Sequence, residues 1–274
     1  MEESNKNPFS EAYYIQKSNL LRKNTTTLIY NARKGHIGGC FSCMDILVAL
    51  YYSGVFQLSP DNRADHFILS KGHCATALYA VLQDCGHISE DELFSYGKNG
   101  TMLGGHPDYR LQGIDVTSGS LGMGLGIGAG IVYAKRKDGS DSATVVMTGD
   151  GECYEGSIWE AAMFASHHSL CKLIWVIDRN QLCCLDETED CLKLEPLSDR
   201  IRAFGWEVQD VDGHSIEQLI SSMKNARYTK SNKPQAIIAN TIKGKGVSFM
   251  ENQLIWHHKV PDEDEYKKII AELS

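Results

Sequence analysis

Short apolar runs separated by polar and glycine-rich turns dominate the chain and predict an alternation of strands and helices. Five of these runs are short and bounded by turn residues, as is typical of strands. They cover residues 66–70, 143–148, 173–177, 206–211 and 235–239. Because helical periodicity fills the stretches between them, we expect an α/β fold with a doubly wound, mostly parallel sheet and helices on both faces.

The segments before and between the strands carry apolar residues at helical spacing. The predicted helices cover residues 11–34, 42–52, 73–85, 89–96, 117–137, 157–168, 198–204 and 216–226. Residues 97–116 lack periodicity, and a loop of that length inside a compact domain is usually functional. We expect a single domain over residues 1–274, with an N-terminal helical extension.

The two central strands are each followed by a polar segment, Gly149-Asp150-Gly151 and Asp178-Arg179-Asn180-Gln181-Leu182. In a parallel βαβ unit both strands end at the same edge of the sheet, where open α/β folds bind ligands, so Asp150 and Asn180 should lie side by side. Carboxylate, carboxamide and carbonyl oxygens suit Mg²⁺, and the glycines let backbone N–H groups approach a phosphate. The pattern predicts a Mg²⁺-diphosphate site. Taken alone, GDG is more often a simple turn in which Asp150 acts as a cap.

GDG followed later by Asp178-x-Asn180-x-Leu182 resembles the thiamine diphosphate motif, and the sequence around it resembles transketolase. The resemblance implies that Asp150, Asn180 and the Leu182 carbonyl bind Mg²⁺, for which Ca²⁺ or Mn²⁺ can substitute. It also implies that Gly151, Asn180 and Glu155 belong to the cofactor-binding residues, with Gly151 against the diphosphate.

Four histidines lie in segments that resemble transketolase motifs. The segments are Gly35-His36-Ile37-Gly38-Gly39, Lys71-Gly72-His73, Gly104-Gly105-His106-Pro107 and Trp256-His257. The resemblance implies that these histidines surround the reacting carbons as catalytic residues, with His73 and His257 also binding the cofactor. Histidine suits proton transfer because its pKa is about 6.5, although the sequence assigns no base among the four. Without the resemblance, such histidines are exposed turn residues or helix starts.

Two further segments carry expected cofactor contacts. Ser118-Gly119-Ser120-Leu121 opens a glycine-rich helix whose glycines need a packing or ligand reason, and it resembles the segment that touches the aminopyrimidine and thiazolium through Gly119, Ser120 and Leu121. Lys243 lies in a TIKGKG segment that follows the last strand, and the resemblance gives it the role of offsetting phosphate charge. His257 follows Lys243 by fourteen residues, the family spacing, which favours it over His258. Alone, KGKG is more often a solvated basic turn.

Composition narrows the choice of function classes. A hydrophobic content of 42% supports a full core, and a net charge of −8 without a basic stripe argues against a nucleic-acid partner. The N-terminal stretch lacks the apolar core of a signal peptide, and residues 121–132 are too short for a membrane span. Nine cysteines without such a signal indicate free thiols in a reducing cytoplasm, and the lone Cys40-x-x-Cys43 pair is a weak zinc signal.

The resemblance runs from about residue 11 to 262 and covers only the diphosphate-binding half of a transketolase. It implies a partner, a separate C-terminal subunit that supplies the pyrimidine-binding half in an α₂β₂ assembly, without which the chain is inactive. Glu155 and Glu160 match the family contact between the two halves. They fit equally well as ordinary surface acids near a helix N-terminus, where negative charge is favoured.

The expected function is that of a subunit of a thiamine diphosphate-dependent transketolase of carbohydrate metabolism, which transfers a two-carbon ketol unit from a ketose or ketose phosphate to an aldose. One alternative is a transketolase-like enzyme for apiose-derived or sulfonated ketoses. Another, a deoxyxylulose-phosphate synthase-like enzyme, is disfavoured by the Trp256-His257 pair. A catalytically silent regulatory paralogue is disfavoured by the intact Asp150, Asn180 and His73. A nicotinamide dehydrogenase lacks the GxGxxG that should open the first strand-helix turn.

Overall fold

The computed structural model describes residues 10–60 and 62–274, so the first nine residues of the N-terminal stretch considered above lie outside the described residues. The main sheet has the strand order β3-β4-β5-β7-β6, and every neighbouring pair is parallel. Its strands are β3 (His66–Leu69), β4 (Thr144–Gly149), β5 (Leu173–Arg179), β6 (Glu207–Asp212) and β7 (Gln235–Asn240). The predicted α/β fold is confirmed, and the expected strands form one parallel sheet.

Helices precede, connect and follow these strands. They are α1 (Glu11–Ala32), α2 (Ile37–Ser42), α3 (Met44–Tyr52), α4 (Ala75–Asp84), α5 (Glu90–Leu93), α6 (Gly124–Lys137), α7 (Gly156–His167), α8 (Thr188–Cys191), α9 (Leu197–Ala203), α10 (Ile216–Arg227) and α11 (Glu263–Glu272). Short 3₁₀ turns occur at η1 (Gly72–Cys74), η2 (Gly151–Tyr154) and η3 (Leu254–His257), and β1 (Leu58–Ser59) pairs with β2 (Asn62–Arg63) in a small hairpin.

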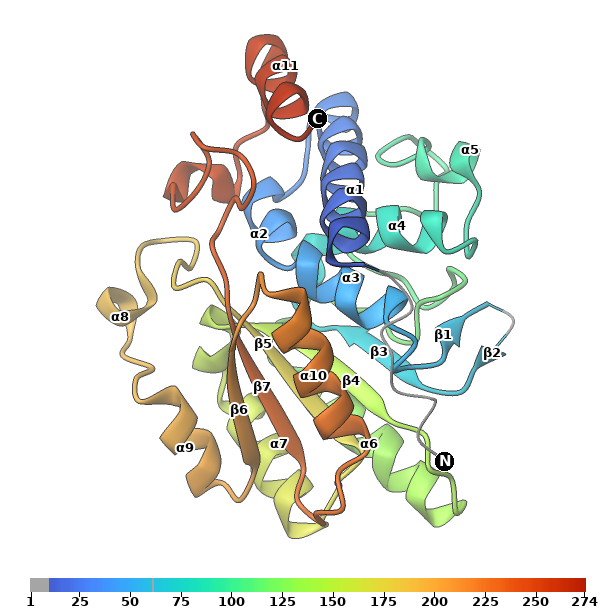
Figure 1. Cartoon of the computed structure of the whole chain (residues 1–274), viewed down its shortest axis with the longest axis vertical. Helices are drawn as coiled ribbons and strands as arrows, with labels where there is room; N and C mark the ends of the chain where they lie inside the picture. Colours follow the sequence, from blue (N-terminus) through green and yellow to red (C-terminus); the bar gives the residue numbers. More distant parts are fainter. Residues whose placement is uncertain (1–9, 61) are drawn as a thin grey trace.

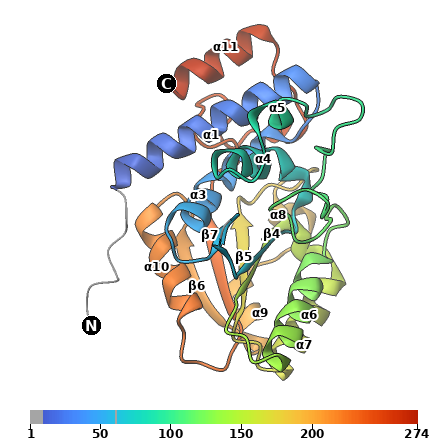
Figure 2. The same cartoon turned by 90° about the vertical axis from the view of Figure 1, so that its right-hand side faces the viewer.

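Successive residues of each central strand enter two different hydrophobic cores, one on each face of the sheet. In β5, Ile174 and Val176 belong to the core that also contains residues of α1, α3, α4 and α10, whereas Trp175 and Ile177 belong to the core that contains residues of α6, α7 and α9. This alternation follows from the two-residue period of a strand, and burial on both faces explains why the strand sequences are continuously apolar. Figures 1 and 2 show α1, α4 and α11 stacked above the sheet, beyond one of its edges.

Close packing against the sheet explains two of the glycines in α6. A Cβ on Gly128 would lie 2.5 Å from Val146 Cγ2, and one on Gly124 would collide with Ser70. These two positions, one helical turn apart, let the helix backbone lie directly on β3 and β4. By contrast, Gly126 and Gly130 lie on the outer face of the helix and are exposed.

Several predicted boundaries were wrong. The helix expected over residues 42–52 is present as α3, which begins at Met44. The residues before it, expected to form a glycine-rich turn, instead form the short helix α2, with His36 directly before its first residue. The helix expected from residue 117 begins at Gly124, because Gly119 and Gly122 have φ of +141° and +84°, which are not helical. The β1–β2 hairpin and α11 were not predicted, although Asp262 and Glu265 form a capping box.

Helix length and polarity also bear on membrane insertion. Among the described residues, no helix combines the length and apolar character that crossing a membrane requires.

Candidate functional site

A cavity of about 510 Å³ lies at the carboxyl edge of the sheet. It draws residues from segments that are far apart in the sequence, which the parallel topology brings to one edge. Most of the predicted site residues line it: His36, His73, His106, Gly119, Leu121, Asp150, Gly151, Asn180, Leu182, Lys243 and His257. Ser120 and Glu155 are exposed and lie outside this lining.

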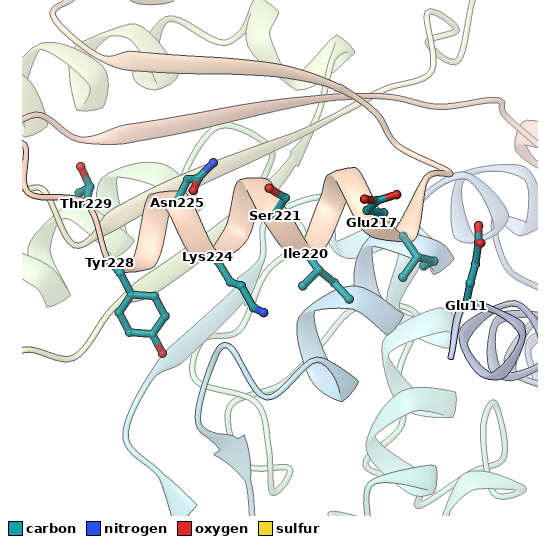
Figure 3. Close-up of a pocket in the computed structure, with 9 residues that line it drawn as sticks. Glu11, Glu217, Ile220, Ser221, Lys224, Asn225, Tyr228 and Thr229 are labelled. Atoms are coloured by element: carbon teal, nitrogen blue, oxygen red, sulfur yellow. The ribbon is translucent and has the colours of Figure 1, made fainter. Parts of the chain in front are cut away.

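A second hollow, of about 850 Å³, lies along α10. Figure 3 shows its side chains, most of them spaced along α10, among them Ile220 and Lys224, with Glu11 of α1 near the start of that helix. All the predicted site residues lie outside it, and it gathers no cluster of groups suited to proton transfer or metal binding among its lining residues. The cavity at the sheet edge is therefore the candidate site.

Asp150 joins the ends of the two central strands. Gly149 pairs with Asp178, and the Asp150 N–H donates to the Asp178 carbonyl at 3.2 Å. The Asp150 carboxylate accepts the N–H groups of Gly151 at 2.8 Å and Gln181 at 2.6 Å. The expected adjacency of the two polar segments is thus present in the structure.

The Asp150 carboxylate is buried beside both a cation and an anion. Arg179 Nη1 donates to it at 3.2 Å, and Arg179 also pairs with Glu189 and Glu195 at 3.0 Å each. Burial raises the pKa of Asp150, and the charge of Asp178 adds to this effect, against the opposing influence of Arg179. A buried anion in this balance favours a further cation nearby.

The carbonyl of Leu182 already faces a positively charged group. Lys243 Nζ donates to this oxygen at 2.8 Å and to the Cys183 carbonyl at 3.2 Å. Lys243 is almost completely buried, and burial together with the charge of Lys71 lowers its pKa to about 8. The same nitrogen lies 2.7 Å from Nδ1 of His257. Because an ammonium group only donates, the proton of the neutral His257 ring is on Nε2.

His36, His73, His257 and His258 form one compact cluster that lines the cavity. The ring centroid of His36 lies 5.2 Å from that of His73 and 5.6 Å from that of His257. His258 joins them at 4.6 Å from His36, and one ring nitrogen from each of His36, His257 and His258 lies within 4.8 Å of the others. All these rings can therefore face the same small ligand.

Burial favours the neutral form of His36, His73 and His257. Burial and the neighbouring His258 lower the pKa of His36 to about 4, and burial with Lys243 lowers that of His257 to about 3. Burial, followed by the charge of Lys71, places the pKa of His73 well below its usual value. At neutral pH these rings each offer one donor and one acceptor nitrogen.

His106 reaches the cavity from the long loop that the sequence marked as functional. A Cβ on Gly119 would lie 3.0 Å from the His106 ring, and the φ of Gly119, +141°, also favours glycine. The His106 carbonyl accepts the Tyr79 hydroxyl at 2.9 Å, which ties the loop to α4. This close packing fixes the position of the loop.

Two buried charged residues that support the site, Lys71 and Asp178, were not identified by the sequence analysis. The Asp178 carboxylate accepts hydrogen bonds from Lys71, Ser42 and Thr241, joining the end of β5 to η1, α2 and the end of β7. Lys71 is completely buried, yet Asp178 raises its pKa well above the usual value despite that burial. Both residues lie in segments that resemble transketolase motifs, Lys71-Gly72-His73 and Asp178-x-Asn180-x-Leu182. Their position in these segments was a signal that could have identified them as site residues.

Glu152 was also missed. Its carboxylate accepts the N–H groups of Gly122 at 2.9 Å and Gly149 at 3.2 Å, together with the Ser70 hydroxyl. It therefore fixes the glycine-rich segment against the end of β4, and it lines the cavity. Glu155, the acid singled out from the sequence, lies on the surface beside Gly122.

Three cysteines also line the cavity: Cys183, Cys184 and Cys191. They lie in the irregular stretch after β5, where the sequence showed no periodicity to place them. The Sγ atoms of Cys183 and Cys191 are 3.2 Å apart.

Comparisons with known proteins agree with this geometry. A family model described as the thiamine diphosphate binding domain of transketolase matches residues 15–273. The chain is 42% identical over 257 residues to one subunit of the apulose-4-phosphate transketolase of Phocaeicola vulgatus, covering 92% of this chain and 91% of the relative. It is 40% identical over 263 residues to 6-deoxy-6-sulfo-D-fructose transketolase subunit SqwG of a Clostridium species, covering 94% and 95%.

Longer relatives match over only part of their length. Human transketolase is 36% identical over 260 residues, which is 93% of this chain but 41% of the human protein. The crystal structure of transketolase from Campylobacter jejuni superposes with a TM-score of 0.90 at 27% identity, over 97% of this chain and 43% of that one. From the match over nearly the whole chain, the site at the sheet edge and the similarity to these proteins, we conclude that the chain belongs to the transketolase family and corresponds to its thiamine diphosphate-binding domain.

Proposed function

We propose that this chain is the diphosphate-binding subunit of a split transketolase, active only with a separate C-terminal subunit in an α₂β₂ assembly. The pair transfers a two-carbon ketol unit from a ketose donor to an aldose acceptor. The observation that carries the proposal is the convergence of Asp150, Asn180 and the Leu182 carbonyl on the cavity that also collects His36, His73, His106 and His257. Its support from relatives is that two of similar length are named as subunits.

The residues present fit thiamine diphosphate and a divalent cation. Asp150, Asn180 and the Leu182 carbonyl supply the hard oxygens that Mg²⁺ prefers, and Ca²⁺ and Mn²⁺ accept the same kind of donors. Gly151 leaves room for a phosphate, since it carries no Cβ at the cavity wall. The buried Lys243 and Lys71 add positive charge near the diphosphate position. Gly119, Ser120 and Leu121 form the segment proposed to contact the cofactor rings.

When bound, thiamine diphosphate supplies a carbanion that accepts and then releases the two-carbon unit. The chain's own residues bind and orient the sugars and move protons on their hydroxyl groups. His36, His73 and His257 suit this role because their rings are neutral and lie side by side. Lys243 holds the His257 ring in one orientation through Nδ1. His106 lines the same cavity beside Gly119.

The outer face of α6 and α7 is the surface we assign to the C-terminal subunit. Its exposed large apolar side chains are Ile127 on α6 and Met163 and Phe164 on α7, and Leu121 and Met123 are exposed in the segment directly before α6. The two helices lie side by side in Figures 1 and 2. Gly126 and Gly130 are exposed on this face and permit close approach of another helix. Leu121 also lines the cavity, so a partner on this face would reach the cofactor.

A cytoplasmic location is part of the proposal. The nine cysteines are all free thiols in the structure, which agrees with a reducing compartment.

The proposal also concerns the identity of the donor sugar. The sequence of this chain is 42% and 40% identical to the subunits from Phocaeicola and Clostridium but 36% identical to human transketolase. An apiose-derived or sulfonated ketose is therefore the alternative donor to a common ketose phosphate. A panel of donors and acceptors, tested with the assembled pair, would distinguish these cases.

The decisive experiment isolates the partner that co-purifies with the full chain and measures cofactor binding by calorimetry. We expect thiamine diphosphate to bind the pair in the presence of Mg²⁺, and sugar exchange to require both subunits. Cofactor-dependent ketol transfer by the chain alone would contradict the split-enzyme proposal. Failure of the pair to bind thiamine diphosphate would contradict the cofactor assignment.

A further inference from the structure

The turn after Leu182 holds two cysteines in contact at the rim of the cavity. The Sγ atoms of Cys183 and Cys191 lie 3.2 Å apart, and both residues are at least partly accessible to solvent. A disulfide bond is about 2.0 Å long, so bond formation requires an approach of roughly 1 Å. Side-chain rotation and a small backbone adjustment of a surface turn can provide this.

Both cysteines are held in place by hydrogen bonds to anchored backbone. Cys183 follows Leu182, which forms a β-bridge with Glu187. The N–H of Cys183 donates to the Asp186 carbonyl at 3.0 Å. Cys191 ends α8, where its N–H donates to the Glu187 carbonyl at 3.1 Å. The helix start is itself fixed by the Tyr154 hydroxyl, which donates to the Thr188 carbonyl at 2.6 Å. The two sulfur atoms therefore meet because of the local fold.

The Cys183 sulfur is also held by hydrogen bonds within the turn. The backbone N–H groups of Leu185 and Asp186 both donate to it at 3.4 Å. Its own thiol donates to the Asp186 carbonyl at 3.2 Å, so the turn holds this sulfur in place beside Cys191.

Four of the other thiols are shielded from oxidants, whereas Cys85 and Cys171 are partly accessible. Cys40, Cys43, Cys74 and Cys153 are completely or almost completely buried, and such thiols are unreactive towards soluble oxidants. Cys184, the next residue after Cys183, is exposed and serves as a matched control.

We propose that Cys183 and Cys191 are a modification site, forming a reversible disulfide that weakens cofactor binding at the neighbouring cavity. The second half of this inference rests on the proposed function, because it concerns thiamine diphosphate and Mg²⁺. Leu182, directly before Cys183, supplies a proposed metal ligand, and a Cβ on Gly151 would lie only 3.2 Å from Cys183 Cβ. Moving Cys183 towards α8 thus displaces two groups: the Leu182 carbonyl, which is the proposed metal ligand, and the Cys183 side chain beside Gly151, where the diphosphate is proposed to bind.

The oxidant belongs to the class of small disulfides, of which oxidised glutathione is the test compound. One cysteine thiolate attacks a sulfur of the oxidant, forming a mixed disulfide and releasing one molecule of thiol. The second cysteine then attacks the protein-bound sulfur, forms the Cys183–Cys191 bond and releases the second thiol. Two electrons and two protons pass from the two cysteines to the oxidant.

Mass spectrometry of the full chain, reduced and then treated with oxidised glutathione, tests the bond. We expect a loss of two hydrogen atoms and a cross-linked Cys183–Cys191 peptide in the unmodified chain and in Cys184→Ser, both reversed by dithiothreitol. Cys183→Ser and Cys191→Ser should lack the cross-link and carry a glutathione adduct on the remaining thiol. A cross-link through Cys184, or persistence of both thiols while Cys184 is modified, would overturn the proposal.

Calorimetric titration of the assembled pair with thiamine diphosphate and Mg²⁺ tests the consequence. Oxidation should weaken binding by about tenfold, the scale of changes around a metal ligand, and dithiothreitol should restore it. The Cys183→Ser/Cys191→Ser double variant should bind equally well before and after oxidant treatment. Equal affinities of the reduced and the disulfide-linked chain would overturn the regulatory role. If the reduced pair binds no cofactor, the proposed function fails while the peptide map still decides the disulfide.

Discussion

The Asp150 carboxylate accepts the backbone N–H of Gln181 at 2.6 Å, so the segment after β4 is bonded directly to the segment after β5. The same carboxylate lies 3.2 Å from Arg179. Asp150 thus has a structural role in the free chain in addition to its proposed role as a metal ligand, and the two roles call for separate measurements.

Replacing Asp150 by asparagine separates these roles. Asp150→Asn keeps the shape and one acceptor oxygen but removes the charge, so Mg²⁺-dependent cofactor binding by the assembled pair should fall by more than about 100-fold. Arg179 retains Glu189 and Glu195, so the free energy of unfolding should fall by only about 1–3 kcal/mol. Calorimetry and urea denaturation measure the two effects. The control is Asp199→Asn, an exposed acid on α9. Cofactor affinity unchanged in Asp150→Asn would remove this residue from the metal site.

The neutral histidines predict a dependence of stability on pH. The pKa of His36 is lowered to about 4 and that of His257 to about 3, both by burial first, whereas an unfolded histidine titrates near 6.5. Between these values the unfolded chain binds more protons than the folded chain, so this contribution to stability is complete above about pH 6.5 and is lost as the pH falls through that window. Urea denaturation at several pH values should show a shallower acid slope for His36→Gln/His257→Gln than for the unmodified chain. Parallel slopes would contradict the burial of these rings as neutral groups.

Two glycines of α6 give a matched pair of substitutions with opposite expected signs. In Gly128→Ala the new Cβ lies 2.5 Å from Val146 Cγ2, so overpacking should cost about 1–3 kcal/mol of unfolding free energy. In Gly126→Ala the nearest atom is 3.9 Å away, so the higher helix propensity of alanine should add up to about 1 kcal/mol. Thermal or urea denaturation of the free chain compares them. Equal effects in both variants would mean that α6 does not lie against the sheet as described.

The apolar face of α6 and α7 predicts where assembly is sensitive. Met163→Glu replaces an exposed apolar side chain of α7 by a charge and should weaken association with the proposed C-terminal subunit by more than about tenfold while leaving the free chain folded. Ile15→Glu is the control, because Ile15 is similarly exposed but lies on α1. Sedimentation of the mixed subunits measures association. If both variants assemble normally, the proposed interface lies elsewhere.

The sequence was sufficient to place the central βαβ unit because its signals are local. Strands β4 and β5 are short apolar runs, and each ends at a polar segment, so parallel topology alone brings Asp150 next to the segment of Asn180. The glycine spacing of α6 likewise indicated close packing before its partner was known. The resemblance to transketolase added the histidines, which come from four separate segments and which no periodicity would have joined.

What the sequence did not reveal depends on long-range contacts. Lys71 and Asp178 are both polar, and only the folded chain shows that they are buried as a pair. Glu152 and Glu155 are indistinguishable by composition, yet a 3₁₀ turn directs the first inward to Gly122 and leaves the second on the surface. The contact between Cys183 and Cys191 depends on a turn and a four-residue helix whose sequence has no clear period.

The bonds around Asp178 have a consequence for how the two halves would come together. Its carboxylate joins Lys71, Ser42 and Thr241, so the sheet edge next to the cavity is braced by contacts within this one chain. A site shaped in advance loses little conformational freedom when a second protein docks, and more of the contact energy remains as affinity. On this view the chain's half of the site is already preorganised before association, and binding of the proposed partner closes the site without refolding it.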